Sequence, residues 1–121
     1  MKIIKAFVHA FKGIAYALQH ELNFKIQLIA ALMVILLGFY FGISTTEWLF
    51  VIGSCTIVLC LELMNTAIEK TCDLVTTKFH PAIKIIKDIA AGAVLMSAIG
   101  TAITGLVIFL PKIIHLIKSL P

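Results

Sequence analysis

The sequence contains no arginine and few charged residues of any kind. Charged residues make up only 13% of the 121 residues, and hydrophobic residues make up 61%. A soluble domain normally has about 25% charged and about 45–50% apolar residues. A chain this short cannot hide so much apolar surface in its own core. The composition therefore excludes an ordinary soluble domain and a disordered chain, and it favours an integral membrane protein.

Several short motifs that carry chemistry are also absent. The three cysteines (Cys55, Cys60 and Cys72) form no CxxC pair, so we expect free thiols. The four histidines do not have the spacing of zinc ligands, which argues against a zinc site. The sequence has no GxxxxGK(S/T) loop, no GxGxxG loop and none of the HRD and DFG elements of soluble protein kinases. A nucleotide site in this chain must therefore have another design.

Long apolar runs are the main feature that is present. They cover residues 26–43, 48–64 and 89–110. Each is close to the roughly 20 residues that a helix needs to cross a bilayer. Because backbone hydrogen bonds must be closed within lipid, we predict three transmembrane helices in one all-α membrane domain over residues 1–121.

The lysines predict the orientation of these spans. Lysines precede the first span and also lie between the second and third spans, whereas residues 44–47 contain none. By the positive-inside rule, the N-terminus and the segment 65–88 are cytoplasmic and the C-terminus is outside. We expect Trp48 to be an interfacial anchor on the outer side.

Residues 1–20 differ from the three spans. Apolar residues recur there at helical spacing, with lysines largely on the other side, which predicts an amphipathic helix on the membrane surface. The third span carries small residues at every fourth position, which allow helices to approach closely. They are Ala93, Ser97, Thr101 and Gly105. Because three spans enclose little interior, we expect a homo-oligomer.

Polar residues inside the second span are unusual. Glu62 is followed by Asn65, Glu69 and Asp73, and on a helix these four residues fall within an arc of about 80°. Charges inside a membrane span are costly and mark functional sites. Carboxylates bind Mg²⁺ through oxygen, and a carboxylate in a low-dielectric site can act as a general base. This polar line can join a lipid hydroxyl to a water-soluble nucleotide.

Two smaller polar groups accompany this line. Lys84, Lys87 and Asp88 come just before the third span, where Lys87 can contact a nucleotide phosphate as a point charge. Taken alone, the two lysines also fit side chains that extend from a helix start to the membrane surface. Glu21 and Lys25 come just before the first span, and we expect Glu21 to complete the metal site.

These residues resemble a known family. Residues 62–73 (ELMNTAIEKTCD) are similar to the prokaryotic diacylglycerol kinase signature, E-x-x-N-(S/T)-(S/A)-(L/I/V)-E-x-x-x-D. Residues 21–25, 79–81 and 87–94 add supporting matches, and the resemblance runs from about residue 5 to residue 112. It implies a small homotrimeric enzyme of the bacterial inner membrane that transfers the γ-phosphate of ATP to a lipid hydroxyl.

The resemblance also implies roles for single residues. By this resemblance Glu62 is expected to be the general base, Asn65 to orient the catalytic groups, and Glu21 and Glu69 to hold Mg²⁺. The resemblance also implies that the site is shared between neighbouring subunits. The implied nucleotide contacts are His9, Glu21, Glu69, Asp73, Lys78, Phe79, His80, Lys87 and Asp88.

The acceptor lipid stays open between diacylglycerol and a polyprenol. Val8 and His9 stand where the family commonly has Arg and Tyr, and Gln27 stands where the Gram-negative diacylglycerol enzymes tend to have Glu. Residues 80–94 resemble the branch that includes undecaprenol kinases.

Two other classes of protein fit the composition. A small membrane cation transporter would use the same intramembrane carboxylate, although its acids would more often face both sides. A membrane-anchored scaffold that docks a partner through 65–88 would leave Glu62 and Asn65 unexplained.

Overall fold

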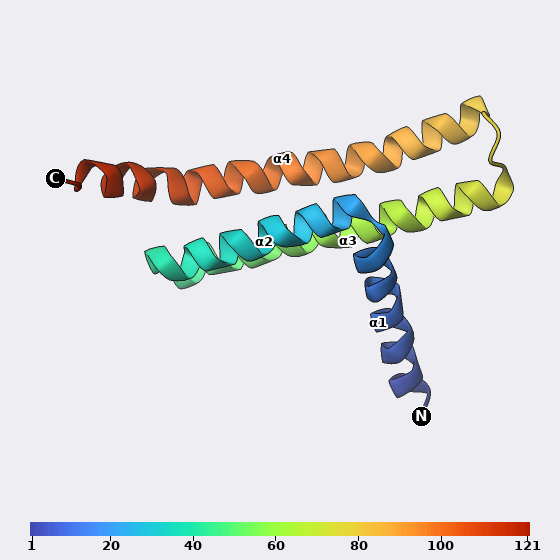
Figure 1. The fold of residues 1–121 in the computed structure, drawn as a ribbon, viewed down its shortest axis with the longest axis horizontal. Helices are drawn as coiled ribbons and strands as arrows, with labels where there is room; N and C mark the ends of the chain where they lie inside the picture. Colours follow the sequence, from blue (N-terminus) through green and yellow to red (C-terminus); the bar gives the residue numbers. More distant parts are fainter.

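The computed structural model describes all 121 residues and is entirely helical. Helix α1 spans Lys2–His20, α2 Leu22–Phe41, α3 Thr45–Val75 and α4 Pro81–Lys118. The all-α class is confirmed, and helices α2, α3 and α4 are long and apolar enough to cross a membrane, as the three predicted spans require. Helices α2 and α4 run in one direction and α3 runs in the other (Figure 1).

Two of the helices extend well beyond their apolar runs. Helix α3 has 31 residues and α4 has 38. At 1.5 Å per residue these helices are about 46 and about 57 Å long, whereas the hydrocarbon layer is about 30 Å thick. The predicted segment 65–88 is therefore mostly helical, because only a short connection separates α3 from α4.

A tight turn joins α2 to α3. Gly42 has φ 59° and ψ 52°, a left-handed conformation that ends α2 at Phe41, two residues before the predicted end of the first span. Ser44 then begins α3 with a capping box: its Oγ accepts from the N–H of Glu47 at 3.2 Å, and its own N–H donates to Glu47 Oε1 at 3.0 Å. The turn is short because both helix ends are satisfied locally.

The buried core is small and lies near this turn. Only 16 of the 121 residues are buried, so most of the long apolar side chains lie on the surface, where lipid would cover them. Trp48 packs directly on Gly38, and its ring lies 4.9 Å from that of Phe39. The main apolar cluster consists of Ala31, Ile43, Val51, Cys55, Ile108 and Phe109.

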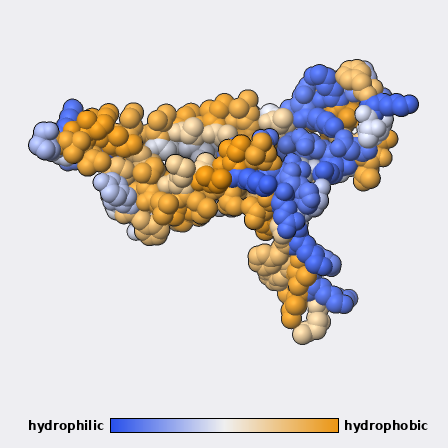
Figure 2. Space-filling view, viewed as in Figure 1, coloured by the Kyte–Doolittle hydropathy of each residue, from blue (hydrophilic) through white to orange (hydrophobic).

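The other end of the molecule is polar. Figure 2 shows hydrophilic residues gathered where α3 passes to α4 and where α1 joins, while the shafts of the long helices are hydrophobic. His80 begins α4 by accepting the N–H of Ala82 on its Nδ1 at 3.1 Å. Helix α1 leaves the bundle at a steep angle, because Glu21 between α1 and α2 has extended backbone angles (Figure 1).

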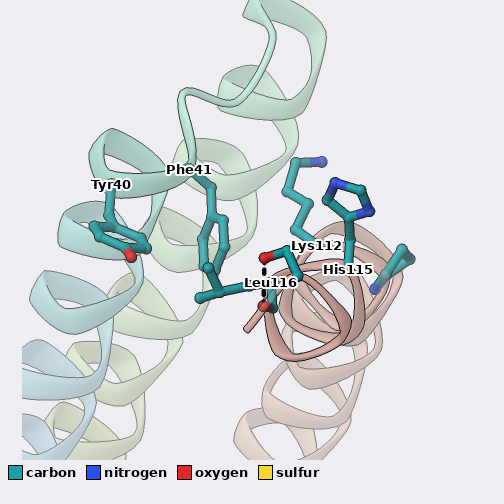
Figure 3. A pocket seen from close by; sticks show the side chains of 7 residues that line it. Tyr40, Phe41, Lys112, His115 and Leu116 are labelled. Carbon is teal, nitrogen blue, oxygen red and sulfur yellow. Dashed lines mark hydrogen bonds between the residues drawn. The ribbon is translucent and has the colours of Figure 1, made fainter. Parts of the chain in front are cut away.

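The end that holds the C-terminus carries an ion pair and a cavity. Lys112 Nζ lies 2.8 Å from Glu47 Oε2, and both side chains are largely covered. A cavity of about 610 Å³ lies beside this pair. Tyr40 and Phe41 of α2 line one side of it and Leu116 of α4 lines the other (Figure 3). None of the predicted site residues lines this cavity.

Candidate active site

The predicted polar line lies on one uninterrupted helix. Helix α3 carries Glu62, Asn65, Glu69 and Asp73, and the exposed fraction rises along it. Glu62 is 5% exposed and Asn65 is 9% exposed, whereas Glu69 is half-buried and Asp73 is exposed. Asn65 Nδ2 donates to Glu69 Oε1 at 3.2 Å. The line therefore leads from a buried carboxylate to the polar end of the molecule.

Asn65 has unused hydrogen-bonding capacity. Its Oδ1 is fully buried and has no hydrogen-bond partner. Leaving a buried acceptor unpaired costs about 1–3 kcal/mol, so such an atom is rare in a native fold and needs an explanation. Glu62 lies nearby within electrostatic reach of Glu69 and of Glu21. Glu62, Glu69 and the free amide oxygen of Asn65 thus lie on one face of α3, with Glu21 within electrostatic reach.

Helix α4 adds basic groups to the exposed end of the line. Lys87 Nζ donates to Asp73 Oδ1 at 2.9 Å, which ties the start of α4 to the end of α3. Because this hydrogen bond favours the charged ammonium, Asp73 raises the pKa of Lys87, which lies before the apolar run of α4. Lys84 Nζ forms a separate pair with Asp88 Oδ2 at 2.6 Å.

A cleft of about 460 Å³ lies beside the α3–α4 connection. Its volume is in the range of small-molecule sites. It brings together the predicted nucleotide residues of this region and adds Thr76, Thr77, Ile83 and Lys84. The predicted residues that line it are Lys78, Phe79, His80, Lys87 and Asp88.

The structure does not bring His9 to this neighbourhood. His9 is exposed in the middle of α1, and its side chain forms no hydrogen bond. Helix α1 projects away from the other helices (Figure 1). Glu21 lies at the junction of α1 and α2 and is half-buried. No three His, Cys, Asp or Glu side chains converge closely enough to hold a metal by themselves. Mg²⁺ commonly takes one or two carboxylates together with substrate phosphates, and its assignment to Glu21 and Glu69 stays a prediction.

Sequence reasoning missed a contact between α1 and α3. The ring of Tyr16 stacks on that of His20 at 4.4 Å, and Lys70 Nζ lies 5.6 Å from the centre of the Tyr16 ring. The spacing of four residues between Tyr16 and His20 signals that they share a helix face. No local pattern indicates that Lys70 joins them.

Comparison with known proteins identifies the family. The family model for prokaryotic diacylglycerol kinase matches residues 8–109. Undecaprenol kinase of Bacillus subtilis (strain 168) is 45% identical over 112 residues, which is 93% of this chain and 91% of that protein. Diacylglycerol kinase of Synechocystis sp. is 34% identical over 115 residues (94% of this chain, 66% of that protein). Diacylglycerol kinase of Escherichia coli (strain K12) is 28% identical over 103 residues (85% and 84%). The chain belongs to the prokaryotic diacylglycerol kinase family and is therefore a lipid kinase.

Proposed function

We propose that this chain transfers the γ-phosphate of ATP to the hydroxyl of undecaprenol, in a reaction that depends on Mg²⁺. The family supports the transfer to a lipid. The choice of lipid is supported by the 45% identity to an undecaprenol kinase, compared with 34% and 28% for two diacylglycerol kinases. Diacylglycerol is the alternative acceptor.

The observation that carries the proposal is the buried carboxylate of Glu62 at the start of the polar line. It is 5% exposed within an otherwise apolar stretch of α3. The hydroxyl of the acceptor lipid, held at the membrane surface, can reach the Glu62 carboxylate, while the phosphate donor stays in water. Glu62 takes the hydroxyl proton as the oxygen bonds to the γ-phosphorus and ADP leaves.

Glu21 and Glu69 are the residues we assign to Mg²⁺. The bound ion supplies positive charge that neutralises the phosphates during transfer. Asn65 holds Glu69 through the 3.2 Å hydrogen bond, and its free Oδ1 offers a further oxygen beside the same carboxylate. Asn65 thereby fixes the direction in which Glu69 faces.

The cleft at the α3–α4 connection is the part we assign to the nucleotide. Lys78 and Lys87 supply positive charge for the phosphates, and Asp73 holds Lys87 in place. Phe79, which is 79% exposed, offers a ring on which a base can stack. Asp88 and His80 complete the lining.

His9 requires a larger assembly. Because α1 projects away from its own bundle, we propose that His9 reaches the nucleotide of a neighbouring subunit in a homotrimer with shared sites. In this arrangement α1 lies on the cytoplasmic surface of the bacterial inner membrane, and the N-terminus and active site face the cytoplasm. Thr101 of the small-residue stripe on α4 donates to the carbonyl of Ser54 on α3 of the same chain at 3.3 Å, so at this position the stripe allows close packing within the chain.

A label-transfer assay tests the proposal. Purified protein in mixed micelles receives γ-labelled ATP and Mg²⁺, with undecaprenol and diacylglycerol in separate tubes. We expect label in undecaprenol, and we expect Glu62→Gln to lower kcat by about 10²- to 10⁴-fold. The matched control is Glu47→Gln, which makes the same change at the other end of α3.

Each part of the proposal has an outcome that contradicts it. Label in diacylglycerol alone would overturn the choice of lipid, and an unchanged kcat in the folded Glu62→Gln variant would overturn its role as base. The cation transporter predicts instead a metal flux into proteoliposomes without ATP. Glu62, Glu69 and Asp73 gather toward one end of α3, and Glu47 at the other end is paired with Lys112, so no line of free acids crosses the span.

A further inference from the structure

Helix α1 is held against the rest of the molecule by a short stretch near its C-terminal end. Ala17 is 1% exposed and is the one buried residue of α1. The chain then turns sharply, with the N–H of Glu21 donating to the carbonyl of Ala17 at 2.8 Å. The rest of α1 projects away from the bundle (Figure 1). The direction of α1 therefore depends on a few contacts close to Glu21.

A cleft of about 310 Å³ separates α1 from α3 beside these contacts. Small residues line much of it, so direct packing between the two helices is sparse. They are Ala10, Gly13, Ala17 and Ala67. Tyr16 and Lys70 also line the cleft, and they face each other across it.

The Tyr16–Lys70 contact bridges this sparse junction. Lys70 Nζ lies 5.6 Å from the centre of the Tyr16 ring, within the range of a cation–π interaction. The ring of His20 also stacks on that of Tyr16 at 4.4 Å, and its Nδ1 donates to the carbonyl of Tyr16 at 3.0 Å. Tyr16 thus has a fixed place, and Lys70 joins α3 to it.

This bridge lies next to two residues that we assign to Mg²⁺. Lys70 directly follows Glu69 on α3, and Glu21 directly follows the last residue of α1. The charge of Lys70 also lies within electrostatic reach of Glu21. A change in the angle between α1 and α3 would therefore change the separation of the two carboxylates.

We propose that Tyr16 and Lys70 are positioning residues that hold α1 against α3, so that Glu21 and Glu69 stay at the separation needed to share Mg²⁺. This inference rests on the proposed function. Loss of either partner frees α1 and weakens the cation site without removing any reacting group. We therefore expect the Mg²⁺ concentration needed for half-maximal rate to rise, while kcat at saturating Mg²⁺ stays nearly the same.

The first test measures the position of α1 directly. Spin labels are placed on cysteines introduced at Lys5 and Thr71 in a protein without native cysteines, and labelled chains are diluted with unlabelled ones. Pulsed electron paramagnetic resonance without ATP or Mg²⁺ gives the α1–α3 distance distribution. We expect Tyr16→Leu and Lys70→Met to broaden it. Lys70→Arg, which keeps a cation over the ring, and the remote control Lys118→Met should leave it unchanged.

The second test measures the cation requirement of the same variants in the label-transfer assay. Tyr16→Leu and Lys70→Met should raise the Mg²⁺ concentration for half-maximal rate by about 2- to 5-fold. Lys70→Arg should keep the Mg²⁺ concentration for half-maximal rate near that of the parent protein, and kcat at saturating Mg²⁺ should change little in all variants.

An unchanged distance distribution in Tyr16→Leu and Lys70→Met would overturn the inference. A broader distribution with an unchanged Mg²⁺ dependence would overturn the positioning role. Failure of the proposed function is distinguishable, because it removes transfer from the parent protein while the distance measurement still reports on α1.

Discussion

The close contact between Gly38 of α2 and Trp48 of α3 yields a test of the packing. A Cβ added to Gly38 would lie 2.6 Å from Cη2 and 2.9 Å from Cζ2 of the Trp48 ring. Non-bonded carbon atoms prefer about 3.5–4.0 Å, so the ring would have to move by about 1 Å. Phe39 lies against the same ring at 4.9 Å and restricts that movement.

The expected cost of Gly38→Ala follows from two opposing effects. Overpacking a core costs about 1–3 kcal/mol. Replacing glycine by alanine inside a helix stabilises it by about 0.5–1 kcal/mol. Gly53→Ala on α3 is the matched control, because a Cβ at Gly53 meets nothing within 4 Å and only the helix effect remains. The free energy of unfolding should therefore be about 1–3 kcal/mol lower for Gly38→Ala than for Gly53→Ala.

Unfolding in detergent micelles by SDS titration, followed by circular dichroism, measures this difference. Trp48 is the only tryptophan, so its emission also reports ring displacement in the Gly38→Ala protein. Trp48→Phe removes both clashing atoms, and adding it to Gly38→Ala should recover most of the loss in a double-mutant cycle. Equal stability of the Gly38→Ala and Gly53→Ala proteins, with no coupling to Trp48, would refute the packing argument.

Gly42→Ala should lower the free energy of unfolding by about 1–2 kcal/mol in the same titration, because the left-handed backbone at φ 59° disfavours a Cβ; Gly42→Asn should cost less, and equal losses would contradict this. Lys112→Met should lower Tm, because it leaves the Glu47 carboxylate without its lysine, and the exchange Glu47→Lys with Lys112→Glu should recover part of the lost Tm. A loss of Tm in the exchanged protein equal to the sum of the losses in the two single variants would refute a direct pair. Chelation of Mg²⁺ with EDTA should abolish label transfer, and added Mg²⁺ should restore it, whereas transfer that persists in EDTA would exclude the cation from the reaction.

Sequence patterns predicted the features that depend on local order. The apolar runs identified the three long helices, because lipid exposure requires continuous hydrophobicity. The spacing of Glu62, Asn65, Glu69 and Asp73 predicted one helix face, and α3 carries all four without a break. The surface position of residues 1–20, the orientation in the membrane and the trimer stay predictions.

Contacts between distant residues could not be predicted in the same way. Lys112 and Glu47 are 65 residues apart, and Asp73 and Lys87 are 14 apart. Such pairs depend on the relative axial position of two packed helices, and the periodicity of a single sequence carries no information about that position. The left-handed Gly42 also ended α2 earlier than hydropathy alone indicated, because hydropathy does not report backbone conformation.

The length of α3 ties the chemistry of this chain to the thickness of its bilayer. Glu62 and Asp73 lie eleven residues apart on one rigid helix, so they are separated by about 16 Å along its axis. Each polar side chain of the line therefore has a fixed position along the membrane normal relative to the others, and none can move along it independently. A membrane thinner or thicker by a few ångströms shifts Glu62 relative to the lipid headgroups unless the helix tilts. Under the proposed function, acyl-chain length in the surrounding membrane becomes a variable that sets whether the acceptor hydroxyl reaches the carboxylate of Glu62.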